Sequence, residues 1–242
     1  KSFFTDAQSV LKNRHSVYYA LVTSLIQHVD PQTLETFGIN IGYMSWTMGA
    51  KMIRAYEKEH SINVPWALIL RYNMPAAKPL DLAKLVSEGQ SIGIFSYFLF
   101  VGSQTADLNA ILDTVAQYRT SAFFLIAEDN ATNMRLAGLD EPFLNAMFIP
   151  RDGGPESIDT AELLSQKKRI FSLNCEYNAA NADWLLSDSF LQSVVDRNYP
   201  FLFLTPAQDC DPETQARVCA GVLALRSAGR FPLFPIDLYT DV

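Results

Sequence analysis

The feature that most constrains this fold is an alternation of short apolar runs with amphipathic stretches, which begins near Val64 and continues to the end of the sequence. Each short apolar run predicts a buried strand, and each amphipathic stretch predicts a helix of about three turns. Strand and helix in repeated alternation favour parallel strands joined by right-handed crossovers. The predicted strands are Trp66–Tyr72, Ile92–Val101, Ala122–Ala127, Ala146–Ile149, Ile170–Cys175, Phe201–Thr205 and Phe231–Leu238. The predicted helices are Pro79–Gly89, Thr105–Tyr118, Asn130–Gly138, Ser157–Lys167, Asn181–Arg197 and Asp211–Ala228.

The alternation predicts an α/β protein, but it leaves the closure of the sheet open. A closed eight-stranded barrel, an open barrel of six or seven strands and a doubly wound sheet all contain such repeats. Six strand–helix repeats and a seventh strand fall short of eight, so the count favours an incomplete (β/α)6-type barrel. In each of these architectures ligands bind at the carboxyl ends of the strands.

The first sixty residues have a different, helical pattern. Apolar residues recur at helical spacing through Val17, Leu21 and Leu25, and Asp30-Pro31 predicts the start of another helix. We therefore predict two parts, a helical leader over residues 1–60 that packs on the barrel, and the partial barrel over residues 61–242. The leader is rich in aromatic and methionine side chains, which suit either packing on the barrel or a partner surface; they are Phe3, Phe4, Tyr18, Tyr19, Tyr43, Trp46 and Met48.

Composition narrows the classes of partner. Among 242 residues, 19 Lys and Arg stand against 26 Asp and Glu, which gives a net charge of −7 and argues against a nucleic-acid surface. The longest basic run, Lys167-Lys168-Arg169, is expected to be a solvated helix end. No uncharged apolar stretch reaches about 18 residues, so no membrane span is predicted. Three unpaired-looking cysteines and the absence of a signal pattern over Lys1–Val10 predict a cytoplasmic protein.

The stretch that leads into the first predicted strand carries a resemblance to a known family. It reads Tyr56-Glu57-Lys58, followed shortly by Val64-Pro65-Trp66-Ala67. This phrase resembles the end of the helical leader in radical S-adenosylmethionine enzymes, where it precedes the first barrel strand. Weaker similarity extends through Asp81–Gly102 and Tyr177–Thr205. The resemblance implies a partial (β/α) barrel and a site at its mouth.

The chain departs from that family where the cofactor would bind. The family's C-x-x-x-C-x-x-C loop holds a 4Fe–4S cluster through three thiolates, whereas residues 71–80 contain no cysteine. Cys175, Cys210 and Cys219 lie too late in the sequence to replace them. The family's Gly-Gly-Glu-Pro is matched only by Gly102-Ser103-Gln104-Thr105, and its Thr-Asn-Gly by Glu128-Asp129-Asn130. No cofactor is therefore expected, although S-adenosylmethionine binding stays open, and a cluster would require a ligand loop that this sequence lacks.

By this resemblance, the candidate site residues follow the strands. Those matched to cofactor binding are Gly102, Ser103, Gln104, Glu128, Asp129, Asn174 and Glu176. Arg71 and Arg151 are candidates to bind a substrate carboxylate, and the simpler alternative is that such arginines pair with neighbouring carboxylates. Glu128 and Asp129 are adjacent, so their side chains are expected to point apart. No metal ligand set is predicted, because His15, His28 and His60 all precede the first strand and suit surface positions.

These features predict a non-catalytic, radical-SAM-like barrel protein that binds a small molecule or partners an active homologue. Two alternatives stay open. One is an active radical SAM enzyme whose cluster loop is absent from this sequence. The other is a barrel enzyme rebuilt for cluster-free chemistry around Arg71, Glu128, Asp129 and Glu176.

Overall fold

The computed structural model describes residues 13–72, 81–105, 107–152 and 155–242, and it shows an α/β protein with parallel strands in two sheets. By contacts the chain forms two compact units, residues 30–170 and residues 1–29 with 171–242. The predicted division into a leader over residues 1–60 and a barrel over residues 61–242 stays a prediction. In the described part of the chain, no helix has the length and apolar composition needed to cross a membrane.

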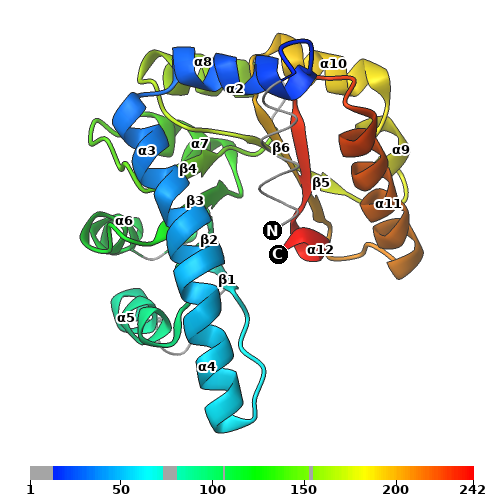
Figure 1. Ribbon diagram of the computed structural model, residues 1–242. Helices are drawn as coiled ribbons and strands as arrows, with labels where there is room; N and C mark the ends of the chain where they lie inside the picture. Colours follow the sequence, from blue (N-terminus) through cyan, green and yellow to red (C-terminus); the bar gives the residue numbers. More distant parts are fainter. Residues whose placement is uncertain (1–12, 73–80, 106, 153–154) are drawn as a thin grey trace. The chain divides into compact units, whose positions relative to one another are not determined.

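The unit over residues 30–170 contains a four-stranded parallel sheet in the order β1-β2-β3-β4. Its strands are β1 (Ala67–Arg71), β2 (Ser96–Val101), β3 (Ala122–Ala127) and β4 (Ala146–Ile149). Its helices are α3 (Pro31–Ile39), the π-helix η1 (Asn40–Gly49), α4 (Ala50–His60), α5 (Leu82–Ile92), α6 (Leu108–Gln117), α7 (Asn130–Ala137) and α8 (Pro155–Gln166). Figure 1 shows α3, η1 and α4 (blue to cyan) as one long helix that runs along this sheet.

The core of this unit follows from the strand register. Every residue of β2 and β3 is buried, as expected for a parallel sheet covered on both faces. Phe98 and Phe124 are register partners, and their rings stack with centroids 4.1 Å apart. Phe37 of α3 meets Phe124 edge to face at 5.3 Å. The aromatic pairs therefore fix the long helix on the sheet.

The unit over residues 1–29 and 171–242 contains a three-stranded parallel sheet in the order β5-β6-β7. Its strands are β5 (Leu173–Tyr177), β6 (Phe201–Pro206) and β7 (Phe234–Asp237). Its helices are α2 (Val17–His28), α9 (Ala182–Leu185), α10 (Asp188–Asp196), α11 (Pro212–Ala228) and α12 (Leu238–Asp241). The Tyr18 hydroxyl of α2 donates to the Arg226 carbonyl at 2.7 Å, and the Tyr18 ring packs on Phe234.

All seven predicted strands are present, and the corrections concern the bounds of elements and the division of one helix. The predicted strand Ile170–Cys175, for example, is observed as Leu173–Tyr177. The predicted strand Ile92–Val101 begins only at Ser96, because Ile92 ends α5 and Gly93 caps it at φ 105°. The predicted helix Asn181–Arg197 is two helices, since the Ser187 hydroxyl accepts from the Phe190 amide and starts α10. Pro79, at the start of a predicted helix, and Phe3 and Phe4 of the leader lie outside the described residues.

Candidate functional site

The predicted site residues of the first unit lie at the carboxyl ends of β1, β2, β3 and β4, where parallel sheets bind ligands. Arg71 ends β1, and Glu128 directly follows β3. Their side chains form an ion pair with Arg71 Nη1 3.0 Å from Glu128 Oε1, and the guanidinium also lies 4.2 Å from the centre of the Phe100 ring. Arg71 thus pairs with a neighbouring carboxylate, which was the simpler of its two predicted roles.

Asp129 holds two backbone segments together. Its Oδ2 accepts the Ser103 amide at 2.6 Å, and its Oδ1 accepts the Thr132 amide at 2.8 Å, which caps the start of α7. Partial burial alone would raise the pKa of Asp129, but the hydrogen bonds from Ser103 and Thr132 outweigh it and lower that pKa. Glu128 and Asp129 therefore point to different partners, as their adjacency predicted.

Gly102 and Ser103 lie in the turn after β2, and both of their amides donate hydrogen bonds within the protein. The Gly102 amide donates to the Thr105 hydroxyl at 2.9 Å, and the Ser103 amide donates to Asp129. A Cβ at Gly102 would lie 3.1 Å from Asp129 Oδ2, so the carboxylate approaches this backbone closely. Gln104 is exposed in the same turn.

Arg151, after β4, is fixed by a residue that sequence reasoning missed. The Arg151 amide donates to Asn133 Oδ1 and its carbonyl accepts from Asn133 Nδ2, both at 2.9 Å, while Arg151 Nη1 donates to the Glu128 carbonyl at 3.0 Å. Asn133 is 2% exposed and shares the buried side of α7 with Leu136 and Ala137. The signal available in the sequence was the polar Asn133 at helical spacing from the apolar residues Leu136 and Ala137.

Replacing Asn133 by alanine is expected to reduce the free energy of unfolding by about 2–3 kcal/mol, because two partly buried backbone groups of Arg151 would lose their partners. Gln104→Ala, at an exposed position on the same edge, is the matched control and should change it by less than about 0.5 kcal/mol. Urea unfolding followed by tryptophan fluorescence measures both. Equal effects from the two variants would show that Asn133 does not hold this edge.

Tyr72, next to Arg71, is a further group at this edge. Its hydroxyl is buried and has no hydrogen-bond partner among the residues that the structure describes. Burial, aided by the charge of Asp81, raises the pKa of Tyr72 to about 12. The phenol therefore stays protonated at neutral pH. Asn73 and the stretch to Leu80, where the family's cluster loop would stand, lie outside the described residues.

Asn174 and Glu176 lie on β5 in the other unit. Asn174 is buried, and its Oδ1 accepts the Thr205 hydroxyl of β6 at 3.2 Å. Glu176 is partly exposed, and its carbonyl accepts from Asn181 Nδ2 at 3.0 Å. The Thr205 bond ties the Asn174 side chain into the sheet interior.

A second polar cluster in this unit was not predicted. Asp237 at the end of β7 is fully buried, and its two carboxyl oxygens accept from the Tyr177 hydroxyl at 3.2 Å and the Thr240 hydroxyl at 2.6 Å. Burial is the main cause that raises the pKa of Asp237, and the nearby Asp241 adds to it. The signal available in the sequence was an acidic residue inside the apolar run Phe231–Leu238.

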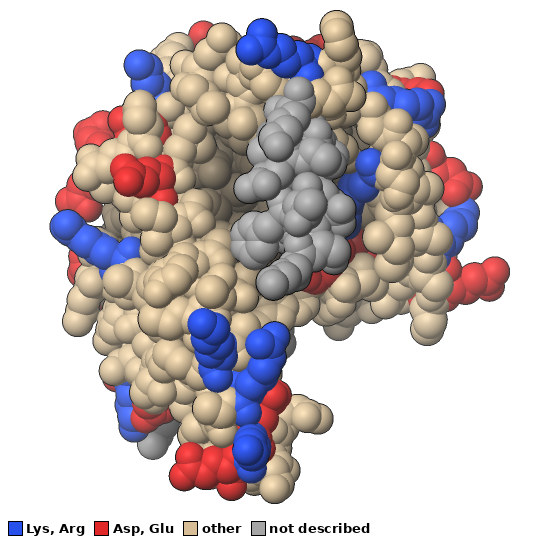
Figure 2. Space-filling model, in the orientation of Figure 1, with Lys and Arg blue, Asp and Glu red and all other residues tan. Residues whose placement is uncertain are grey.

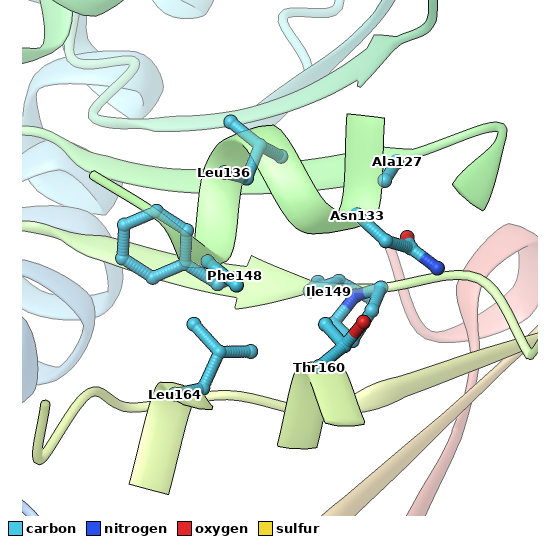
Figure 3. A pocket seen from close by; sticks show the side chains of 9 residues that line it. Ala127, Asn133, Leu136, Phe148, Ile149, Thr160 and Leu164 are labelled. Carbon is cyan, nitrogen blue, oxygen red and sulfur yellow. The ribbon is translucent and has the colours of Figure 1, made fainter. Parts of the chain in front are cut away.

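The described residues of the first unit line an apolar gap and a polar cleft. Figure 3 shows an apolar gap between α7, β4 and α8, with Leu136, Phe148 and Leu164 among the side chains that face it; it is too narrow for a water molecule. The other is a polar cleft of about 310 Å³. Its lining residues are Asp30, Thr33, Asp140, Pro142, Lys167, Lys168 and Arg169.

Two of the three cationic side chains that line the polar cleft, Lys167 and Arg169, bind neighbouring groups of the protein itself. Lys167 Nζ contacts Asp140 Oδ1 at 3.0 Å and two carbonyls, and Arg169 Nη2 donates to three carbonyls of residues 139–141. Arg169 is only 6% exposed, which corrects the expectation that the whole basic run is a solvated helix end. The physical reason is that the loop after α7 offers unpaired carbonyls, which the guanidinium satisfies.

The histidines and cysteines lie where the sequence placed them. His15, His28 and His60 are exposed, and Cys175 is buried in β5. Within the described ranges, no group of three or more His, Cys, Asp or Glu side chains is arranged to hold a metal ion. Comparison with models of known protein families and with curated protein sequences finds no match to this chain.

Proposed function

We propose that this chain is a non-catalytic relative of the radical S-adenosylmethionine enzymes, a partial (β/α) barrel with a helical leader that serves as a binding or partner subunit. The proposal rests on the hydrogen bonds and the ion pair at the carboxyl ends of β1 to β4. There the groups that would face a ligand are bound to one another, through Arg71 with Glu128, Arg151 with the Glu128 carbonyl and Asp129 with Ser103.

The amides at this edge support the same proposal. A ligand carboxylate at this edge would need free N–H donors in the turn after β2. Here the amides of Gly102 and Ser103 donate to Thr105 and Asp129. A ligand such as S-adenosylmethionine would have to displace both bonds, so its binding at this edge is disfavoured.

The donor set also does not fit a 4Fe–4S cluster. Cluster binding needs several cysteine thiolates in one loop. Residues 71–80 contain none, and the three cysteines of the chain occur later, at positions 175, 210 and 219. Cys175 lies in β5 and Cys219 in α11, so these residues do not share a loop.

The test is anaerobic reconstitution of the purified protein with iron and sulfide. We expect no stoichiometric iron, no iron–sulfur absorption and no reductive cleavage of S-adenosylmethionine. About four irons per chain, together with cleavage of S-adenosylmethionine, would refute the proposal and identify an active radical enzyme. Turnover without iron that Glu128→Ala abolishes would instead support cluster-free chemistry and refute it equally.

A further inference from the structure

The long helix made by α3, η1 and α4 has one face that the described residues leave uncovered. Its inner side is buried on the sheet through Phe37, Ser45, Gly49 and Ile53. The opposite side, here called the outer helix face, comprises Glu35, Gly38, Ile39, Gly42, Tyr43, Trp46 and Arg54. In Figure 2 the surface over the middle of this helix is uncharged, with basic side chains gathered over α4.

The middle of the outer helix face is apolar and exposed. Ile39, Tyr43 and Trp46 are 49%, 56% and 49% exposed, although Trp46 also makes an edge contact with Trp66 at 6.3 Å. Three large apolar side chains half exposed within eight residues of one helix form a continuous patch. Such patches mark contact surfaces more often than isolated exposed side chains do.

Two glycines lie within this patch, at positions where the described residues would leave room for a side chain. A Cβ at Gly38 or Gly42 would have no atom within 4 Å beyond its own helix, whereas one at Gly49 would lie 2.4 Å from the Gly93 carbonyl oxygen. Glycine is less favourable than alanine in the interior of a helix. An exposed helical glycine is therefore best explained where another backbone packs closely against it. Small residues allow two helices to pack closely.

The charged residues at the two ends of the outer helix face indicate which partner would bind there. Glu35 lies one turn before Ile39, and the basic residues Lys51 and Arg54 lie in α4 beyond Trp46. Among the described residues, neither Glu35 nor Arg54 forms an ion pair. The face thus has an acidic end and a basic end. In an antiparallel pair of helices the acidic end of one copy lies against the basic end of the other, so the face is self-complementary.

We infer that the outer helix face binds a second copy of this chain, with the two long helices antiparallel. Glu35 of one copy then meets Arg54 of its partner, and Tyr43 meets Trp46. A parallel pair would instead set like charges side by side, which is unfavourable. The inference stands apart from the proposed function, because it uses only this surface.

The contact between two helices buries less accessible surface area than the roughly 1,200–2,000 Å² of a standard stable interface. The dimer is therefore reversible, and its dissociation constant is expected in the micromolar range.

Sedimentation velocity of the full-length protein from about 1 to 200 µM tests the inference. We expect a concentration-dependent monomer–dimer equilibrium. Gly42→Leu should weaken the dimer at least about tenfold without lowering Tm, because a Cβ at this position meets no described atom within 4 Å and leucine favours a helix over glycine. A protein that stays monomeric at every concentration, or that associates only with a different protein, would overturn the inference.

Charge reversal identifies the face. Glu35→Lys and Arg54→Glu should each weaken the dimer about tenfold, and the two variants mixed, or combined in one chain, should restore it. Glu88→Lys on α5, an exposed acid paired with Lys84, is the matched control and should leave the equilibrium unchanged. A dimer that survives both reversals, or is not restored by the pair, would place the contact elsewhere and contradict the inference.

Discussion

Gly93→Ala is expected to lower the free energy of unfolding by about 3–5 kcal/mol. Gly93 ends α5 at φ 105°, a conformation that costs L-residues of order 1–3 kcal/mol. In addition, a Cβ there would lie 2.5 Å from the Gly49 carbonyl oxygen and 2.8 Å from Met52 Cβ. Because the first of these atoms belongs to the backbone of the long helix, the clash adds a packing cost of about 1–3 kcal/mol.

Gly49→Ala separates the clash from the backbone strain. Gly49 has an ordinary helical φ of −58°, yet a Cβ would lie 2.4 Å from the Gly93 carbonyl oxygen and 2.7 Å from that of Met44. We expect a loss of about 2–3 kcal/mol, smaller than for Gly93→Ala. Gly38→Ala, where nothing lies within 4 Å, is the control and should stabilise by up to about 1 kcal/mol.

Urea unfolding of the three variants at submicromolar concentration, below the dissociation constant expected for the dimer, gives the comparison. If Gly93→Ala and Gly49→Ala unfold at the same urea concentration as Gly38→Ala, the long helix does not rest against the end of α5. The close contact of two glycine backbones would then be refuted.

The strands were predictable from the sequence because their signal is local. The apolar runs at β3 and β4 predict the observed bounds without change, because a polar residue or a proline adjoins each run at both ends. The start of β2 was predicted four residues early, because Ile92 to Phe95 are as apolar as the strand itself. Only Gly93, with its positive φ, separates helix from strand there.

The π-helix was not predictable in the same way. Residues Asn40–Gly49 have no regular apolar period, and their hydrogen bonds depend on tertiary contacts. The Ser45 hydroxyl donates to the Asn40 carbonyl five residues earlier and contacts the Ser96 hydroxyl of β2 at 2.7 Å. Because Ser96 is fifty-one residues away, no local pattern could indicate this contact.

Parts of the candidate site were predictable for a related reason. Arg71 ends β1 and Glu128 follows β3, the two strands that flank β2, so the parallel topology brings both to one edge of the sheet. Asn133 and Asp237 were missed because their importance lies in burial, which single residues do not reveal. Asp237 on β7 bonds to Tyr177 on β5, sixty residues earlier, with β6 between the two strands.

Tyr177→Phe is expected to cost about 1.5–3 kcal/mol of unfolding free energy, because it removes a buried hydroxyl donor to the Asp237 carboxyl. The cost should shrink as the pH falls, since a protonated carboxyl depends less on that donor. Asp237→Asn separates the charge from the hydrogen bonds. The amide keeps the size and an acceptor for one hydroxyl, yet it has no charge to bury.

The direction of the pH dependence follows from the raised pKa of Asp237. Burial raises this pKa above the ordinary value of 3.8, so the folded state holds its proton at a pH where the unfolded state has lost it. The stability contributed by this group is fully present below about pH 4 and is lost as the pH rises through the folded pKa. Each unit of elevation corresponds to about 1.4 kcal/mol, so the amplitude of the loss measures the elevation directly.

Wild type and Asp237→Asn, unfolded in urea from pH 4 to pH 8, provide the measurement. The stability of the wild type relative to the variant should be greatest near pH 4 and fall as the pH rises. Carboxyls whose pKa is lowered in the fold, such as Asp129, are present in both proteins, so their acid-range effect cancels in the difference. A difference that is constant with pH, or that grows toward neutral pH, would show that Asp237 is not a buried, proton-holding group.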